Sequence, residues 1–191
     1  MKRKLLTVSL LMLSTAMLGI SGTTFADSNT KGSFLDRWFG GKKPGVAPVE
    51  NPQYLEECGS CHFPYQPGLL PARSWTKMMG SLDNHFGENA ELPAEDANII
   101  KDYLLKNAAD KSSYKRSVKI MKSLRSDDAP LRVSDTPYFV KKHNELTADM
   151  VLNNPKVGSL SNCNACHTQA AKGSFSEKEI LIPNFGAWED N

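Results

Sequence analysis

The four cysteines of this chain all lie in two copies of one short pattern. The copies are Cys58-Gly59-Ser60-Cys61-His62 and Cys163-Asn164-Ala165-Cys166-His167. C-x-x-C-H is the attachment pattern of a c-type haem. Two thiols three positions apart on one turn can reach the two vinyl groups at one edge of a porphyrin, and the adjacent histidine then projects under the ring. The sequence therefore predicts two covalently bound haems c. The attachment residues are Cys58, Cys61, Cys163 and Cys166, and the proximal iron ligands are His62 and His167.

Two other interpretations of the cysteines compete with haem attachment. Two C-x-x-C disulfides would suit an exported protein, and redox-active thiol pairs have this spacing. A zinc ion bound by all four thiolates matches the count of cysteines. Neither interpretation explains why a histidine follows each second cysteine, and Cys61 and Cys163 are 102 positions apart. Haem attachment is therefore favoured.

Each iron also needs a ligand on its second face, and two histidines remain for this role. His85 lies 23 positions after His62, and His143 lies 24 positions before His167. Two leftover histidines for two open positions favour bis-histidine ligation of both irons. The spacing leaves open which iron each of them serves, so a crossed arrangement is an alternative.

Methionine is the other candidate for the distal ligand, because Met/His ligation is common in cytochromes c. Met78 and Met79 follow the first motif, and Met150 precedes the second. However, Trp75, Met78, Met79 and Leu82 recur at the i, i+3, i+4 and i+7 positions of a helix, which is typical of core packing. We therefore expect Met78 and Met79 to pack in the wall of the site. The choice matters because thioether ligation raises the reduction potential.

The N-terminal segment 1–26 has the features of a secretory signal peptide. Residues 2–4 are basic, residues 5–20 are mostly apolar, and residues 24–26 offer small residues for a cleavage site. An uncleaved membrane anchor is the alternative, which the short apolar run disfavours. Cleavage would leave a mature chain that begins at Asp27. Export to the periplasm agrees with the haem interpretation, because c-type haem is attached outside the cytoplasm.

Charge and composition exclude other classes of protein. The chain has 23 basic and 21 acidic side chains, and loss of three basic residues with the signal peptide leaves a net charge of −1. A strongly basic nucleic-acid binder is thereby excluded. No second apolar run is long enough to span a membrane, so we expect a soluble mature protein. Because branched aliphatic residues are sparse, two small domains would need a bound group to stabilise them.

We expect a mainly α-helical protein with two small haem-binding domains. The predicted divisions are residues 1–26 (signal peptide), 27–50 (flexible lead-in), 51–110 (N-terminal haem c domain) and 111–191 (C-terminal haem c domain with long loops). The N-terminal domain resembles the class I cytochrome c fold, in which the first and last helices cross. In that fold a proline carbonyl orients the iron-bound histidine, and Pro67 or Pro71 would take this role.

Local signals place the elements around the motifs. We expect helices that begin at Asn51 with Pro52 in the first turn, over residues 74–83 with Ser74 as N-cap, and over residues 93–106. The proline-rich run 64–71 predicts a loop, and Pro130 and Pro137 mark loops that lead to His143. Thr147 is expected to begin a further helix, and residues 180–183 are expected to be extended.

Seven basic residues lie between positions 111 and 132. They are Lys111, Lys115, Arg116, Lys119, Lys122, Arg125 and Arg132. A solvated connecting helix is the simplest interpretation of this segment. The functional alternative is neutralisation of haem propionates or docking of an acidic partner.

From about residue 50 to residue 183, the chain resembles the dihaem cytochrome c (DHC) family of bacterial periplasmic electron carriers. The matching stretches are Cys58 to His62, Trp75 to Gly87, Thr136 to His143, and Asn162 to His167 with Gly173-Ser174-Phe175. The resemblance implies two bis-histidine haems, with His85 serving the first iron and His143 the second. It also implies electron delivery from a membrane b-type cytochrome to a small oxygen-binding c-type haem protein.

Two functions from different classes follow from these features. An electron carrier needs two low-spin irons closed by strong ligands. An enzyme, such as a small dihaem peroxidase or a nitrogen-oxide reductase, needs one iron open to substrate. No acid/base pair near either motif supports the enzyme, so we expect an electron-transfer protein with no catalytic residues.

Overall fold

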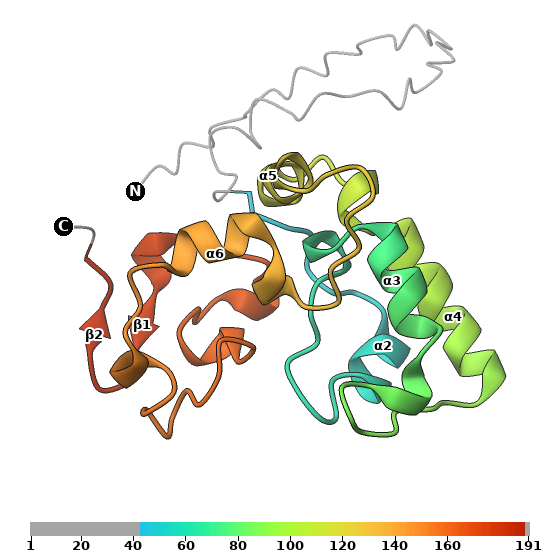
Figure 1. The fold of residues 1–191 in the computed structure, drawn as a ribbon, viewed down its shortest axis with the longest axis horizontal. Coiled ribbons are helices and arrows are strands. Elements are labelled where there is room, and N and C mark those ends of the chain that lie inside the picture. Colours follow the sequence, from blue (N-terminus) through green and yellow to red (C-terminus); the bar gives the residue numbers. More distant parts are fainter. Residues whose placement is uncertain (1–42, 190–191) are drawn as a thin grey trace, which may run out of the picture. The chain divides into compact units, whose positions relative to one another are not determined.

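Short helices and turns make up most of the chain from residue 43 to residue 189, the part that the structure describes. The structure is a computed structural model (Figure 1). The α-helices are α2 (Pro52–Glu57), α3 (Ala72–Met79), α4 (Ala94–Lys106), α5 (Lys115–Ser123) and α6 (Pro137–His143). Strands β1 (Leu181–Ile182) and β2 (Gly186–Ala187) form an antiparallel pair. The predicted mainly helical fold is confirmed. The predicted signal peptide lies outside the described residues.

Single 3-10 turns join the helices. They are η1 (Pro67–Leu69), η2 (Leu82–Asn84), η3 (Ala109–Lys111), η4 (Val133–Asp135), η5 (Ala148–Met150), η6 (Cys163–Ala165), η7 (Ala170–Lys172) and η8 (Glu177–Glu179). From residue 43 to residue 189, every helix is too short or too polar to cross a membrane.

Helices α2 and α4 form where the sequence predicts them. The side chain of Asn51 accepts a hydrogen bond of 2.8 Å from the N–H of Tyr54, which caps α2. Tyr54 is buried, and its ring lies 5.7 Å from that of Tyr103 on α4. Leu55, the other large apolar residue of α2, is 41% exposed. Helix α2 therefore packs on α4 mainly through Tyr54.

Helix α3 begins before the position that the local sequence predicts. It spans Ala72–Met79, so Ser74 is a buried residue inside the helix and not its N-cap. The N–H of Ala72 donates to the carboxylate of Asp110 at 2.7 Å. A side chain 38 positions away thus satisfies the first turn, and Gly80 ends the helix. The prediction of a helix over residues 74–83 is therefore wrong at both ends.

Helix α6 occupies a stretch for which Pro130 and Pro137 predict loops. The Oγ1 of Thr136 accepts a hydrogen bond from the N–H of Phe139 at 3.3 Å and donates one to the carbonyl of Val133 at 2.8 Å. Pro137 takes the first helical position, where proline favours a helix. The loop prediction is wrong because this proline starts an element and does not break one. As a result, His143 lies in the last turn of α6.

The helix expected after Thr147 is much shorter than predicted. Thr147 caps only the 3-10 turn η5. The Oγ1 of Thr147 accepts a hydrogen bond of 3.4 Å from the N–H of Met150, the last residue of this turn. At the C-terminal end, the predicted extended piece is confirmed by strand β1.

Two hydrophobic clusters lie beneath the two motifs. The first contains Tyr54, Leu70, Trp75, Ile100, Leu104 and Ala108. The second contains Val46, Leu69, Ile120, Ala170 and Phe175. Tyr65 and Val133 pack against both clusters. The described residues all fall in one compact unit, so the boundary between domains 51–110 and 111–191 stays a prediction.

The described end of the expected lead-in, residues 43–50, packs on the second cluster. The N–H groups of Gly45 and Val46 both donate to the carbonyl of Gly173, at 2.9 and 3.2 Å. Gly173 has a φ of +73°, and a Cβ on it would lie 2.3 Å from the carbonyl oxygen of Val46. Only glycine fits this position, because both the conformation and the close approach exclude a side chain.

Candidate haem sites

The first motif follows directly on helix α2. Cys58 is the C-cap residue of this helix, and its N–H donates to the carbonyl of Tyr54 at 3.1 Å. A cavity of about 830 Å³ opens beside the motif. Its walls include Cys58, Cys61 and His62 from the motif, and His85 from the turn after η2. The structure therefore brings the predicted residues of the first site together.

The rings of His62 and His85 face each other in this cavity. Their centroids are 6.1 Å apart and their planes differ by 14°. Two metal–imidazole bonds of about 2 Å each, together with the two ring radii, require roughly this separation. The separation of the two rings therefore matches that of two imidazoles bound to one metal atom.

The carbonyl of Phe63 orients His62. The Nδ1 of His62 donates to this carbonyl at 2.8 Å, which leaves Nε2 free for a metal. The expected proline carbonyl does not take this role, so that prediction is wrong. The oxygen of Pro67 accepts from the indole Nε1 of Trp75 at 2.8 Å, and that of Pro71 accepts from backbone N–H groups of α3. The carbonyls of Pro67 and Pro71 therefore accept hydrogen bonds from α3 and not from His62.

His85 lies on a tight turn and approaches the cavity from the other side. Its N–H donates to the carbonyl of Glu88 at 2.7 Å, and the N–H of Glu88 donates back at 3.3 Å. Burial lowers the pKa of His85, and the nearby His62 and Arg132 lower it further. A lowered pKa keeps the imidazole neutral, the form in which it binds metals.

The methionines occupy other positions. Met78 and Met79 line the first cavity but pack against the first hydrophobic cluster. Met150, the candidate beside the second motif, lies on η5 and lines neither this cavity nor the pocket at the second motif. The group that faces His62 is therefore an imidazole and not a thioether.

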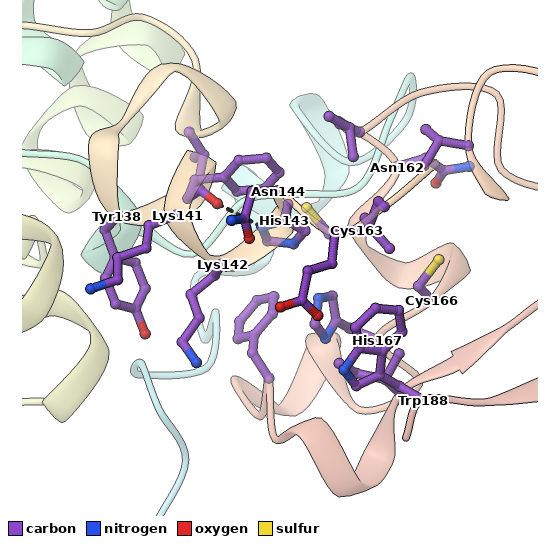
Figure 2. A pocket seen from close by; sticks show the side chains of 18 of the residues that line it. Tyr138, Lys141, Lys142, His143, Asn144, Asn162, Cys163, Cys166, His167 and Trp188 are labelled. Carbon is purple, nitrogen blue, oxygen red and sulfur yellow. Dashed lines mark hydrogen bonds between the residues drawn. The ribbon is translucent and has the colours of Figure 1, made fainter. Parts of the chain in front are cut away.

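The second motif forms the 3-10 turn η6. The N–H of His167 donates to the carbonyl of Cys163 at 2.9 Å, and the carbonyl of Cys166 accepts from the N–H of Leu181 at 3.0 Å. Strand β1 thus anchors the motif from its C-terminal side. Figure 2 shows that Cys163, Cys166, His143 and His167 surround one pocket.

His143 and His167 form the second facing pair. Their ring centroids are also 6.1 Å apart, but their planes differ by 75°. The pocket has a volume of about 190 Å³, below that of the first cavity. The features that indicate a haem at this site are therefore the two imidazoles and the adjacent thiols, and not the volume of the pocket. The pairs that face each other, His62 with His85 and His143 with His167, are uncrossed.

Helix α6 holds His143 firmly. The Nδ1 of His143 donates to the carbonyl of Phe139, one turn earlier, at 2.9 Å. The two rings also stack, with centroids 3.7 Å apart and an angle of 12°. As with His62, Nε2 remains available for a metal. The spacing of Phe139 and His143 by four residues is the signal that could have indicated this contact from the sequence, had α6 been predicted.

Arg116 places a positive charge inside the second site. Its Nη1 donates to the hydroxyl of Tyr138 at 3.0 Å and its Nη2 to the carbonyl of Phe175 at 2.7 Å. Burial, followed by His143 and Arg116, lowers the pKa of His167 to about 4. Arg116 is the exception to the exposed basic face of α5. Its place in a run of basic residues did not distinguish it from its neighbours.

The thiols do not have the character of a redox-active pair. Burial raises the pKa of Cys58 and of Cys163 to about 11, and it also raises that of Cys166. Reactive C-x-x-C thiols have a lowered pKa instead. No disulfide joins the four cysteines. Within residues 43–189, no group of three or more His, Cys, Asp or Glu side chains is arranged to hold a metal ion without haem.

Two sites, each with a C-x-x-C pair and two facing imidazoles, define a c-type cytochrome that holds two haems on one chain. The family model for dihaem cytochrome c (DHC) matches residues 54–175, and the chain belongs to this family. The predicted cofactors, two covalently bound c-type haems, are thereby confirmed. Membership also indicates an electron-transfer role.

Solved structures agree with this assignment. A diheme cytochrome c from Shewanella baltica OS155 is 38% identical, with 73% of this chain and 98% of that chain covered and a TM-score of 0.60. A diheme cytochrome c from Rhodobacter sphaeroides is 43% identical, with 68% of this chain and 100% of that chain covered and a TM-score of 0.61. A DHC purified from Rhodobacter sphaeroides is 41% identical, with 67% of this chain and 99% of that chain covered and a TM-score of 0.55. Among curated proteins no match was found.

Proposed function

We propose that this chain is an electron carrier in which two imidazoles close each iron. The ligands are His62 and His85 at the first haem, and His143 and His167 at the second. When bound, each haem supplies one-electron redox chemistry. The observation that carries the proposal is the separation of 6.1 Å in both ring pairs. Because the chain supplies a ligand to both faces, no coordination position remains for a substrate.

The surrounding residues support this role in two ways. The carbonyls of Phe63 and Phe139 accept from Nδ1 of one histidine in each pair, which directs Nε2 to the metal. Burial of His85, His143 and His167 lowers the pKa of each and disfavours the protonated form that cannot bind. Bis-imidazole ligation leaves the reduction potentials lower than thioether ligation would.

The first experiment tests the ligation in the purified dihaem protein. The oxidised protein should show only low-spin haem, and the reduced protein should bind carbon monoxide slowly, because an imidazole must leave the iron first. His85→Ala should convert the first haem alone to high spin, and His143→Ala the second alone. His85→Met and His143→Met should restore a low-spin iron with a raised potential.

Met150→Leu serves as the control in this series, since this residue lines neither the first cavity nor the second pocket. A wild-type protein that binds carbon monoxide readily would contradict the proposal. That outcome would favour the enzyme, a small dihaem peroxidase or nitrogen-oxide reductase, which needs an open iron.

We further propose that the protein works in the periplasm, between a membrane b-type cytochrome as donor and a small oxygen-binding c-type haem protein as acceptor. Support comes from the resemblance to the family and from the signal peptide predicted over residues 1–26. The partner proposal is tested by rapid mixing of the reduced protein with an oxidised acceptor of this type. A small Met/His cytochrome is the control acceptor, and equal or slower transfer to the oxygen-binding protein would contradict the proposal. Cell fractionation tests the location.

A further inference from the structure

The two distal histidines are held in different ways. His143 donates from Nδ1 to a helix carbonyl and stacks face to face on Phe139. The Nδ1 of His85 is buried and has no hydrogen-bond partner among the described residues. Its neighbour Phe86 contacts it edge-on, with centroids 4.9 Å apart and an angle of 66°. The orientation of His85 therefore depends on the turn that carries it.

This turn is strained at Phe86. The φ of Phe86 is +58°, in the left-handed region that bulky aromatic residues rarely adopt. The hydrogen bonds between His85 and Glu88 close the turn, and the side chain of Asn84 accepts from the N–H of Gly87 at 3.1 Å. A strained conformation of this kind persists only where its surroundings enforce it. The side chain of Phe86 must therefore have a partner that holds it in place.

Arg132 provides that partner from a distant part of the chain. Its guanidinium carbon lies 4.0 Å from the centroid of the Phe86 ring, within the range of a cation–π contact. The backbone around Arg132 is itself fixed, because its carbonyl accepts from the N–H of Asp135 at 3.1 Å and Val133 packs on both hydrophobic clusters. Arg132 also lines the first cavity. A fixed segment thus holds a cation against the strained turn.

We propose that Arg132, acting through Phe86, is the positioning residue that keeps His85 facing His62, and that His85 is the more readily released of the two distal imidazoles. The inference rests on the proposed bis-histidine ligation and adds an asymmetry between the two sites. With haem bound, opening of the turn would withdraw the Nε2 of His85 and leave its position to a small neutral ligand with a lone pair. No electron or proton is transferred in this exchange.

The experiment uses the purified dihaem protein and the variants Arg132→Gln, Phe86→Leu and their combination. Leucine, like phenylalanine, rarely adopts the left-handed conformation, so Phe86→Leu removes the aromatic ring and keeps the backbone strain. Carbon monoxide is the probe. We expect each single variant to speed formation of the adduct at the first haem about two- to fivefold, the effect of losing one exposed cation–π contact. The double variant should match the singles, because both remove the same contact.

A second measurement is independent of the haem spectrum. Hydrogen–deuterium exchange of the segment 82–90, followed by mass spectrometry, should quicken in the same variants and remain unchanged over α6. Arg125→Gln is the matched control, because it removes an equal charge from the same region but pairs with Asp127 and Asp128 instead. Arg132→Lys retains the charge without the planar group and should lie between wild type and Arg132→Gln.

Three results would overturn the inference. They are an effect of Arg132→Gln no larger than that of Arg125→Gln, an adduct that forms at the second haem first, and additive effects in the double variant. A wild-type protein that binds carbon monoxide without delay would instead overturn the bis-histidine ligation on which the inference rests.

Discussion

The planes of the four imidazoles are set by residues next to them, and the two pairs differ. Phe139 stacks on His143 and fixes its plane, whereas the turn around His85 fixes the plane in the first pair. The angle between the planes is 14° in the first pair and 75° in the second. Near-parallel imidazoles donate into the same iron orbital, whereas near-perpendicular imidazoles donate into two different ones.

We therefore expect two distinct low-spin signals in the electron paramagnetic resonance spectrum of the oxidised protein. The parallel pair should give a rhombic signal, and the perpendicular pair a strongly anisotropic signal. His85→Met should abolish the rhombic signal alone. Two rhombic signals of equal shape would show that the rings of the second pair do not stay nearly perpendicular.

The protonation of His167 predicts how the second site responds to acid. Burial, His143 and Arg116 hold its pKa at about 4, below the ordinary value of about 6.5 for histidine. Because the pKa is depressed in the folded state, the stability linked to this group is present above about pH 6.5 and is lost as the pH falls towards 4. Iron competes with the proton for the same ring.

The low-spin spectrum of the second haem should therefore persist on acidification to about pH 4 and disappear only below it. A spectroscopic titration of the oxidised protein measures this midpoint. Conversion to high spin near the ordinary pKa of histidine would mean that one imidazole of this site, His143 or His167, titrates like an exposed side chain, contrary to the burial of both.

At the scale of elements, helix α6 determines the second site through one cap. Thr136 is fully buried and bonds both to Phe139 and to Val133. Thr136→Ala removes the cap and should lower the free energy of unfolding by about 1–2 kcal/mol. Thr136→Ser, which keeps the hydroxyl, should lose less than half of this.

Because α6 carries His143 and not His85, the same substitution should disturb the second haem selectively. Denaturant titration gives the stability, and the spin state of each haem gives the selectivity. An equal loss for alanine and serine would show that the methyl group of Thr136, and not its hydroxyl, stabilises this region.

At the scale of the molecule, Tyr65 connects the two sites. It lies three residues after His62, its ring is 5.4 Å from that of His62, and its hydroxyl donates to the carbonyl of Ser161. Ser161 lies just before the second motif, and both Tyr65 and Ser161 line the first cavity. A hydrogen bond from Tyr65, next to the first motif, thus anchors the segment that leads into the second motif.

Tyr65→Phe should therefore change the second site although the residue is adjacent to the first. We expect a loss of about 1 kcal/mol in the free energy of unfolding, from the missing hydrogen bond, and a shift in the reduction potential of the second haem. Tyr103→Phe is the control, since its hydroxyl accepts from the N–H of Glu50 and its ring packs on the first cluster. A potential that moves only at the first haem would show that the bond to Ser161 does not connect the sites.

The sequence alone determined the features that depend on neighbouring residues. Haem attachment needs two thiols and an imidazole within five consecutive positions, so Cys58 to His62 and Cys163 to His167 indicate it directly. The starts of α2 and α4 could likewise be predicted, because the residues that favour a helix start lie within one turn of it. The short list of distal candidates, His85 and His143, followed from counting the histidines.

Only the tertiary structure decided which side chains meet. Asp110 caps α3, Arg116 enters the second site, Arg132 covers Phe86, and Phe63 replaces the expected prolines. The spacing left the partners of His62 and His167 open, and the family resemblance implied the pairs that the fold brings together. The different angles within the two pairs emerged only from the fold. The physical reason is range: attachment chemistry acts between adjacent residues, whereas the cap of α3, the contacts of Arg116 and the cation–π contact of Arg132 join residues tens of positions apart. Local spacing does not encode how the chain brings such residues together.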